Sequence, residues 1–202
     1  MEVILIRHAN SMGNARITTD LNSDLTELGY KQAEVTAKFL SEYLNAEWYQ
    51  EGEIWSSPYK RTLKTSWAIA EETGLPVSQD FRLREIIQEQ GHYNKDSFPL
   101  SINENKGWCL FKLEDNQQTI DRLQDFVYFT PTVTKKLIIV SHGIPTRILK
   151  DLFINYNDNS YKMMGLPEWD GTFKNCSITH IKDGEVILDR YTEHLLKGDC
   201  FI

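Results

Sequence analysis

Short apolar runs alternate along this chain with longer stretches whose apolar residues recur at every third or fourth position. Two of the runs, residues 3–6 and 137–140, are apolar throughout, which is typical of strands buried on both faces of a parallel sheet. The last two runs flank the pair Asp183-Gly184, which is a strong signal for a hairpin. The predicted strands comprise residues 3–6, 54–56, 77–79, 137–140, 177–181 and 186–189.

Four stretches with helical periodicity separate these strands. The first is expected to begin at Thr26, because a threonine hydroxyl can accept from the free N–H groups of a first turn. Ser57-Pro58 has the form of a cap followed by proline at the first helical position, and Gly74 is expected to end that second helix. The predicted helices comprise residues 26–44, 57–74, 118–129 and 145–154, and the second is expected to bury Leu63, Ser66, Ala70 and Thr73.

This alternation of strands and helices predicts an α/β fold with a mostly parallel sheet covered by helices on both faces. The hairpin would add an antiparallel pair at one end. A length of 202 residues fits a single domain, with a variable insertion at about residues 86–118, where the periodicity fails. Right-handed crossovers place every strand-to-helix turn at one edge of the sheet, where open α/β sheets bind ligands.

Three of these turns carry side chains suited to a phosphoryl group. Arg7-His8 follows the first strand, Arg61 lies in the first turn of the second helix, and His142 follows the strand at residues 137–140. Guanidinium groups offer forked, permanently charged donors to phosphate, and a neutral imidazole is a good nucleophile near neutral pH. Glu85 is the best-placed carboxylic acid to protonate a leaving oxygen. The sequence therefore predicts phosphoryl transfer with neither a metal nor another cofactor.

Composition and charge narrow the possible partners and locations. The formal net charge of −7 argues against a nucleic-acid surface or an anionic membrane partner. Three cysteines without metal-ligand spacing indicate a reducing compartment. Because no apolar run is long enough to span a bilayer and the first residues lack the features of a signal peptide, we expect a cytoplasmic protein. The histidines interpreted as structural or surface residues are His92, His180 and His194.

Five segments form an ordered set: Leu5-Ile-Arg-His-Ala-Asn-Ser-Met-Gly-Asn14, Leu25-Thr-Glu-Leu-Gly29, Ser56-Ser-Pro-Tyr-Lys-Arg61, Leu83-Arg-Glu85 and Val140-Ser-His-Gly143. With this set the sequence resembles the histidine phosphatase superfamily, in the branch that includes cofactor-dependent phosphoglycerate mutases and related phosphatases. The resemblance covers most of the chain. It implies a three-layer α/β/α sandwich and chemistry through a phosphohistidine.

The resemblance also implies a role for each matching residue. His8 would be the nucleophile, and Glu85 would protonate the leaving group and then activate water. The phosphoryl group would be clamped by Arg7, Arg61 and His142. Further contacts in the phosphate pocket would come from Ser11, Asn14 and the backbone of Gly143.

Two departures from the family pattern affect these expectations. Ala9 stands where glycine is commonest, which predicts that this loop has an ordinary backbone conformation, because alanine disfavours a positive φ. The sequence after Glu85 does not follow the usual continuation, which leaves Glu89 as a competing proton donor.

The segment at residues 86–118 bears on the choice between a mutase and a phosphatase. It contains three lysines, five acidic residues and no arginine, so it is a poor clamp for the second acidic group of a bisphosphate. The sequence therefore predicts a metal-independent phosphatase acting on a phosphomonoester, with a phosphorylated small molecule as the expected substrate. The alternatives are a phosphoglycerate mutase-type phosphotransferase, a phosphoprotein phosphatase and a low-turnover phosphate-binding regulatory protein. Substrate identity and oligomeric state are left open by the sequence.

Overall fold

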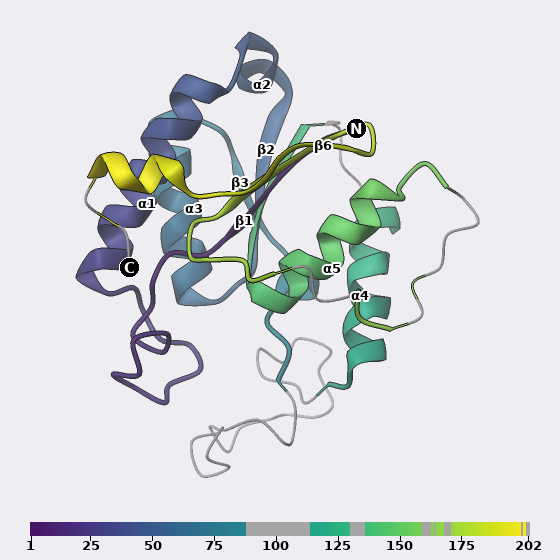
Figure 1. The fold of residues 1–202 in the computed structure, drawn as a ribbon, viewed down its shortest axis with the longest axis horizontal. Helices are drawn as coiled ribbons and strands as arrows, with labels where there is room; N and C mark the ends of the chain where they lie inside the picture. Colours follow the sequence, from purple (N-terminus) through teal and green to yellow (C-terminus); the bar gives the residue numbers. More distant parts are fainter. Residues whose placement is uncertain are drawn as a thin grey trace.

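The computed structural model contains a six-stranded sheet with helices on both faces (Figure 1). The structure describes residues 1–87, 114–129, 136–158, 163, 165–167, 171–198 and 200. The strand order is β3-β2-β4-β1-β5-β6. Most of the predicted insertion lies outside the described residues, and with it Glu89, His92 and Cys109.

The strands on one side of the sheet are parallel, and the last two are antiparallel. β4 and β1 occupy the centre, as the uniformly apolar sequences of both strands predict. Asp183 and Gly184 form the turn between the last two strands with φ values of 51° and 88°, which confirms the predicted hairpin. The strands are β1 (Glu2–Arg7), β2 (Gly52–Ser56), β3 (Val77–Gln79), β4 (Lys136–Ser141), β5 (Ile178–Lys182) and β6 (Glu185–Tyr191).

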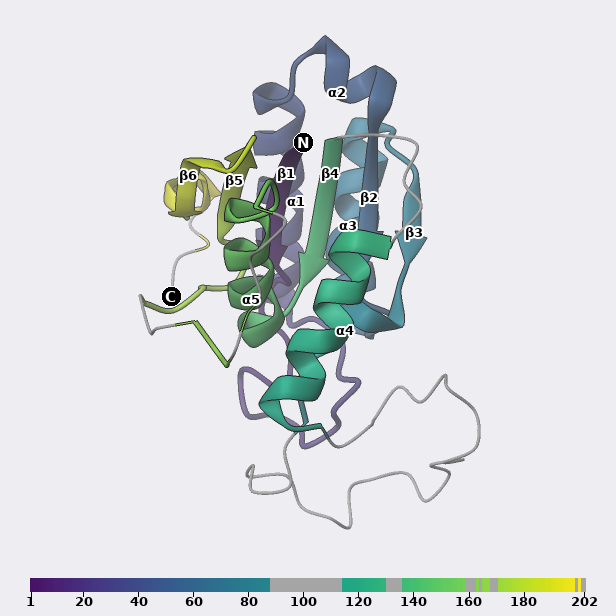
Figure 2. The ribbon, with the colours of Figure 1, turned by 90° about the vertical axis from the view of Figure 1, so that its right-hand side faces the viewer.

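The helices form two layers, one on each face of the sheet (Figure 2). α1 (Glu27–Tyr43) and α3 (Lys60–Thr73) pack against one face, while α4 (Asn116–Phe129) and α5 (Gly143–Ile154) pack against the other. A short helix that the periodicity does not predict, α2 (Ala46–Glu51), precedes β2; six residues are too few for an apolar repeat. The predicted three-layer α/β/α sandwich is confirmed.

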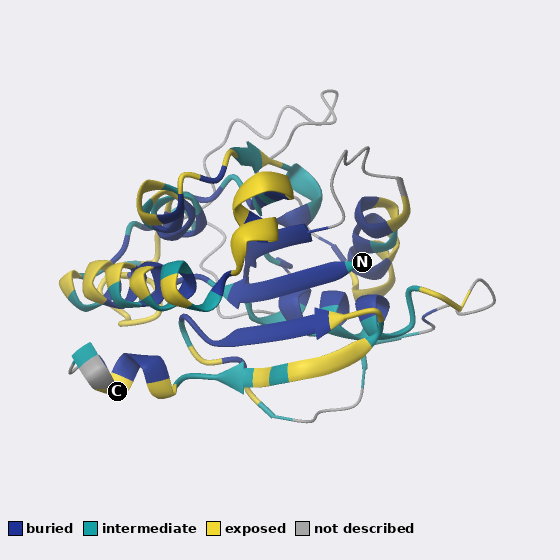
Figure 3. Ribbon diagram, turned by 90° about the horizontal axis from the view of Figure 1, so that it is seen from above, coloured by how far each residue is buried: buried dark blue, intermediate teal, exposed yellow. Residues whose placement is uncertain are grey.

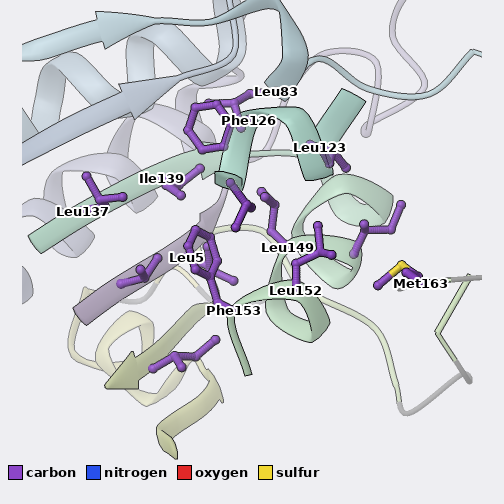
Figure 4. Close-up of a cluster of buried hydrophobic side chains, with 14 of the residues drawn as sticks. Leu5, Leu83, Leu123, Phe126, Leu137, Ile139, Leu149, Leu152, Phe153 and Met163 are labelled. Atoms are coloured by element: carbon purple, nitrogen blue, oxygen red, sulfur yellow. The ribbon is translucent and has the colours of Figure 1, made fainter. Parts of the chain in front are cut away.

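Alternate side chains of the central strands enter the two cores. Val3 and Leu5 of β1 join the core beneath α4 and α5, whereas Ile4 and Ile6 join the core beneath α1 and α3. Figure 4 shows the first of these cores, with Leu5 close to Phe153 of α5. The inner strands are buried, and the outer strand β6 is largely exposed (Figure 3). The central strands therefore have little freedom to shift register, because a one-residue slip would exchange the two cores.

The start and the buried face of α3 differ from the prediction. The helix begins at Lys60 with Tyr59 at its N-cap, so Ser57-Pro58 is not the cap. The backbone N–H of Ser57 instead donates to Val140 O (3.1 Å), which holds this residue at the edge of the sheet. Leu63 and Ala70 are only half-buried. The buried residues of the helix are Arg61, Thr62, Thr65, Ser66, Ile69 and Thr73.

Hydroxyl groups explain why sequence periodicity misplaces that face. Thr65 Oγ1 donates to Arg61 O (2.8 Å), and Ser66 Oγ donates to Thr62 O (2.9 Å), both one turn back in the same helix. These bonds satisfy the hydroxyls internally, so polar side chains are buried at little cost. The other helix ends agree with the prediction to within two residues, with Thr26 capping α1 and Gly74 ending α3 at a φ of 73°.

Backbone pairing continues for one residue past the ends of the parallel strands. His8 N donates to Ser141 O (2.9 Å), and Asp80 N donates to Ser56 O (3.0 Å). His8, Ser57 and Asp80 are thereby fixed at the carboxyl edge of the sheet.

Two of the histidines outside this edge have structural partners. His180 bonds to Tyr43 Oη through Nδ1 (2.7 Å) and to Glu2 Oε1 through Nε2 (3.0 Å). His194 is buried and bonds to Thr36 Oγ1 through Nε2 (3.0 Å). The structural interpretation of both is confirmed.

Cys176 and Cys200 are buried free thiols. Among the described helices, none is long and apolar enough to cross a membrane.

Candidate active site

A pocket with a volume of about 620 Å³ opens at the carboxyl edge of the sheet. Its walls include Arg7 at the end of β1, His8 directly after it, Arg61 from α3, and Glu85 after β3. His142, at the N-cap of α5, lies behind His8 with the two ring centroids 5.1 Å apart. The structure thus brings together all five residues that the sequence singles out for catalysis.

His8 is held by one acceptor and one donor. Its Nδ1 lies 2.7 Å from the carbonyl oxygen of Ala9, which can only accept a hydrogen bond. Its Nε2 accepts from Arg61 Nε at 3.1 Å, because a guanidinium can only donate. These partners assign the ring hydrogen to Nδ1 and leave a lone pair on Nε2.

The surroundings of His8 keep the ring neutral. Burial lowers the pKa of His8 well below its ordinary value, and the nearby charges of Arg61 and Arg7 lower it further. The Ala9 carbonyl opposes this shift. At neutral pH the imidazole is therefore neutral, with its lone pair on Nε2, where it accepts from Arg61 in this structure; the neutral ring is the form a nucleophile needs.

Two guanidinium groups are fixed beside this imidazole. Arg61 also donates from Nη1 to Leu21 O (2.6 Å), and its Cζ lies 4.5 Å from the centroid of the Tyr59 ring. Arg7 donates from Nη1 to Phe173 O. Burial lowers the pKa of Arg7, while the nearby Glu85 raises it. Together the two groups offer a preorganised site for an oxyanion.

His142 is fully buried and bonds to Ser57 through Nε2, with Oγ at 2.8 Å. Ser57 Oγ also accepts a long bond from Tyr59 N (3.5 Å), so its hydroxyl hydrogen is available to Nε2. In that arrangement the ring hydrogen of His142 is on Nδ1, an atom that is buried without a hydrogen-bond partner among the described residues. Burial, followed by the charge of Arg61, lowers the pKa of His142 well below its ordinary value. The ring is therefore neutral, and in this arrangement its Nδ1–H is the donor.

Glu85 follows the short 3₁₀ segment Phe81–Leu83 and is partly exposed at the pocket. Its Oε1 accepts from Ile86 N (3.1 Å). Burial raises the pKa of Glu85, against the opposing charges of Arg61, Arg7 and Arg122. A raised pKa lets the carboxyl keep its proton at higher pH, as a general acid requires.

Ser11 and Asn14 belong to the loop at residues 8–14, here called the catalytic loop, and both line the pocket. Ser11 Oγ donates to Asn14 Oδ1 (3.1 Å). Asn175, which sequence reasoning misses, donates from Nδ2 to His8 O (2.8 Å) and to Asn14 Oδ1 (3.1 Å). Gly143 opens α5 close to Arg7, because a Cβ placed on it would lie 3.9 Å from Arg7 Nε.

The backbone of the catalytic loop has an ordinary conformation at Ala9, as predicted, since its φ is not positive. Ala9 is fully buried and its N–H donates to Thr65 Oγ1 (3.1 Å). In the part of the chain that the structure describes, no group of three or more His, Cys, Asp or Glu residues is placed to hold a metal ion.

A comparison with known protein families gives a match over nearly the whole chain. Residues 3–191 match the family described as the histidine phosphatase superfamily, branch 1. The chain belongs to the histidine phosphatase superfamily. The site above is built from residues of that matched region.

Relatives in sequence include both mutase and phosphatase names. The chain is 28% identical over 199 residues to the probable phosphoglycerate mutase GpmB of Salmonella typhi, covering 90% of this chain and 84% of that protein. It is 42% identical over 89 residues to phosphoserine phosphatase 1 of Hydrogenobacter thermophilus, a match that covers 43% of this chain and 39% of that protein.

Two solved structures with the same fold are phosphatases. A mycobacterial glucosyl-3-phosphoglycerate phosphatase in complex with VO3 has a TM-score of 0.66 at 19% identity, covering 95% of this chain and 99% of that chain. A phosphoserine phosphatase of Entamoeba histolytica in complex with 3-phosphoglyceric acid has a TM-score of 0.60 at 20% identity, covering 96% and 98%. At these identities the likeness shows the shared fold.

Proposed function

We propose that this protein is a metal-independent phosphatase that hydrolyses a phosphomonoester through a phosphohistidine on His8. The observation that carries the proposal is the protonation and hydrogen bonding of the His8 ring. Its Nδ1 is bound to Ala9 O, and its Nε2 lone pair lies beside Arg61 in a pocket that also holds Glu85. Membership of the superfamily supports this reading.

The first half-reaction transfers the phosphoryl group to the protein. The lone pair of His8 Nε2 attacks phosphorus, the bond from phosphorus to the ester oxygen breaks, and the proton of Glu85 passes to that oxygen. Glu85 has the raised pKa that this role needs. The products are an alcohol, phosphohistidine and the Glu85 carboxylate.

The second half-reaction returns the site to its starting state. The Glu85 carboxylate takes a proton from water, the water oxygen attacks phosphorus, and the phosphorus–nitrogen bond breaks. Inorganic phosphate leaves, and His8 regains its lone pair. Arg7, Arg61 and the Nδ1–H of His142 stabilise the charge on the phosphoryl oxygens in both steps, in the role that a metal ion has in other phosphoryl-transfer sites.

Charge in the pocket favours hydrolysis of a monoester over a mutase reaction. Arg7 and Arg61 are committed to the reacting phosphoryl group, and Arg16 is the remaining cation among the described lining residues. It shares the wall with Asp20, which offsets its charge. A mutase needs further positive charge for the second acidic group of its substrate.

The direct test is to trap the intermediate. Wild-type protein mixed with a radiolabelled phosphomonoester and quenched in alkali should carry label on histidine, and His8→Asn should carry none. His180→Gln is the matched control, because His180 bonds to Glu2 and Tyr43 away from the pocket. Label that persists in His8→Asn would refute the assignment of the nucleophile.

A panel of substrates separates the remaining alternatives. Hydrolysis of small phosphomonoesters supports the phosphatase, and preference for phosphoproteins indicates the phosphoprotein phosphatase. Rapid interconversion of phosphoglycerates in the presence of 2,3-bisphosphoglycerate, with negligible hydrolysis, would indicate a mutase. Phosphate binding without turnover of any ester would indicate a regulatory protein.

A further inference from the structure

We propose that Arg122 of α4 is the positioning residue that holds the acid Glu85 at the pocket. Glu85 lies outside the helices and strands, so its own secondary structure does not fix its backbone. The inference rests on the proposed function, because it concerns the acid of that reaction.

Three consecutive carbonyl groups before Glu85 are bound by side chains from other elements. Arg122 donates from Nη1 to Arg82 O and from Nη2 to Arg84 O (2.9 Å). Between them, Leu83 O accepts from Ser141 Oγ (2.7 Å). Arg122 thus binds the carbonyl groups on both sides of Leu83, and the second of them belongs to the residue directly before Glu85.

Arg122 is itself held in one orientation by a buried carboxylate. Its Nε donates to Glu114 Oε2 at 2.8 Å, and Thr119 Oγ1 lies 3.3 Å from the same oxygen. Arg84 pairs with Oε1 of Glu114. The side chains of Arg122 and Glu114 are 9% and 2% exposed, so solvent competes little with these bonds. A planar guanidinium whose three nitrogens are all hydrogen-bonded is a rigid support.

Packing against the core also holds residues 82–84, the segment that precedes Glu85. Leu83 is fully buried and joins the core cluster that contains Phe126, one turn along α4 from Arg122 (Figure 4). The cation of Arg82 lies over the ring of Phe126, 5.4 Å from its centroid. Leu83 therefore fixes the position of the segment against the core, and Arg122 fixes the direction of its carbonyls and hence of the side chain that follows.

If Glu85 is the general acid, its misplacement should slow the reaction only for esters whose leaving oxygen needs a proton. A general acid matters most when the leaving oxygen is a poor leaving group, as in an alkyl phosphate. A nitrophenolate leaves without a proton. Because kcat/KM reports only the steps up to formation of the phosphohistidine, the ratio of kcat/KM for the two esters isolates the contribution of the acid.

The experiment compares Arg122→Gln and Arg122→Lys with wild type on p-nitrophenyl phosphate and on an alkyl phosphate, serine phosphate. We expect kcat/KM for the alkyl ester to fall by about 100-fold in Arg122→Gln, since a misplacement of about 1 Å costs on that order. The value for the nitrophenyl ester should change less than about threefold, and Arg122→Lys should recover part of the loss. The ratio within one sample does not depend on the fraction of folded protein.

Lys150→Gln is the matched control. It removes a partly buried cation of α5, the helix beside α4, from its ion pair with Asp189 of β6, and the ratio should stay at the wild-type value. If Arg122→Gln yields too little folded protein, Ser141→Ala tests the same segment by removing the bond to Leu83 O, and it should shift the ratio in the same direction.

Equal losses on both esters, or no loss on either, would overturn the positioning role. Glu85→Gln separates that outcome from failure of the proposed function. If Glu85→Gln shows the ester-selective loss and Arg122→Gln does not, only the positioning role fails. If Glu85→Gln shows no selective loss, Glu85 is not the acid, and the acid step of the proposed mechanism fails while the role of His8 as nucleophile is tested separately by the trapped intermediate.

Discussion

Gly29 lies in the first turn of α1, where the helix meets the catalytic loop, and its replacement by alanine tests how closely that contact controls activity. A Cβ on Gly29 would lie 1.9 Å from the carbonyl oxygen of Asn10. The same oxygen accepts from Thr26 N (3.0 Å), so the helix and the loop are bonded where they approach most closely. Asn10 is two residues from His8.

The structure sets the size of the effect. Real Cβ contacts are not shorter than 3.0 Å, so either the helix or the loop must move by about 1 Å. Overpacking of this kind costs about 1–3 kcal/mol, and alanine returns about 1 kcal/mol of helix propensity. We therefore expect a net loss of no more than about 2 kcal/mol, which is a fall in Tm of at most about 4–8 °C at this chain length. The loss of activity should be larger, about 100-fold in kcat/KM, because the shift reaches the loop that carries His8.

The assay combines thermal unfolding with kcat/KM for p-nitrophenyl phosphate, corrected for the fraction of protein that forms the trapped phosphohistidine. Lys31→Ala is the control, since Lys31 is exposed on the same helix and tests only propensity. A Gly29→Ala variant with wild-type kcat/KM would refute the argument that this contact sets the position of the catalytic loop.

Three further predictions concern Arg61, His194 and the absence of a metal requirement. Arg61→Lys should lower kcat/KM by about 100- to 1000-fold with little change in Tm, because the one ammonium nitrogen of lysine cannot replace the separate Nε and Nη1 donors that Arg61 directs to His8 Nε2 and Leu21 O. Steady-state kinetics and thermal unfolding check this. Burial lowers the pKa of His194 to about 4, so its contribution to stability is present above pH 6.5 and is lost as the pH falls toward 4. That contribution is at most about 3 kcal/mol, and His194→Gln should flatten the pH dependence of the free energy of unfolding in this range; an unchanged slope would contradict the assignment. Activity should survive EDTA and be inhibited by vanadate, whereas complete loss on chelation, restored by a metal ion, would contradict the metal-independent mechanism.

Local sequence predicts most of the fold because the deciding interactions lie within a few residues. Thr26 caps α1 through Gly29 N, three residues on, and Gly74 ends α3 at a positive φ. The apolar runs of β1 and β4 lie at the centre of the sheet, since only buried strands are apolar on both faces. The order of these elements is enough to place the strand-to-helix turns at one edge, and thereby to bring His8, Arg61 and His142 together.

The state of the site depends on contacts between distant parts of the chain. The bond from Arg61 to His8 joins residues 53 positions apart, and the bond from Asn175 to His8 joins residues 167 positions apart. Ser57 looks like a helix cap in the sequence, yet the pairing of its N–H with β4 turns its hydroxyl to His142.

The sequence by itself determines which residues reach the edge of the sheet, because periodicity and turn chemistry are local. Only the tertiary structure decides which ring nitrogen of His8 keeps its lone pair and which side chain holds the segment of Glu85. Hydrogen-bond partners such as Arg61 and Arg122 are chosen by the packing of separate helices against one sheet, and no local pattern encodes that packing.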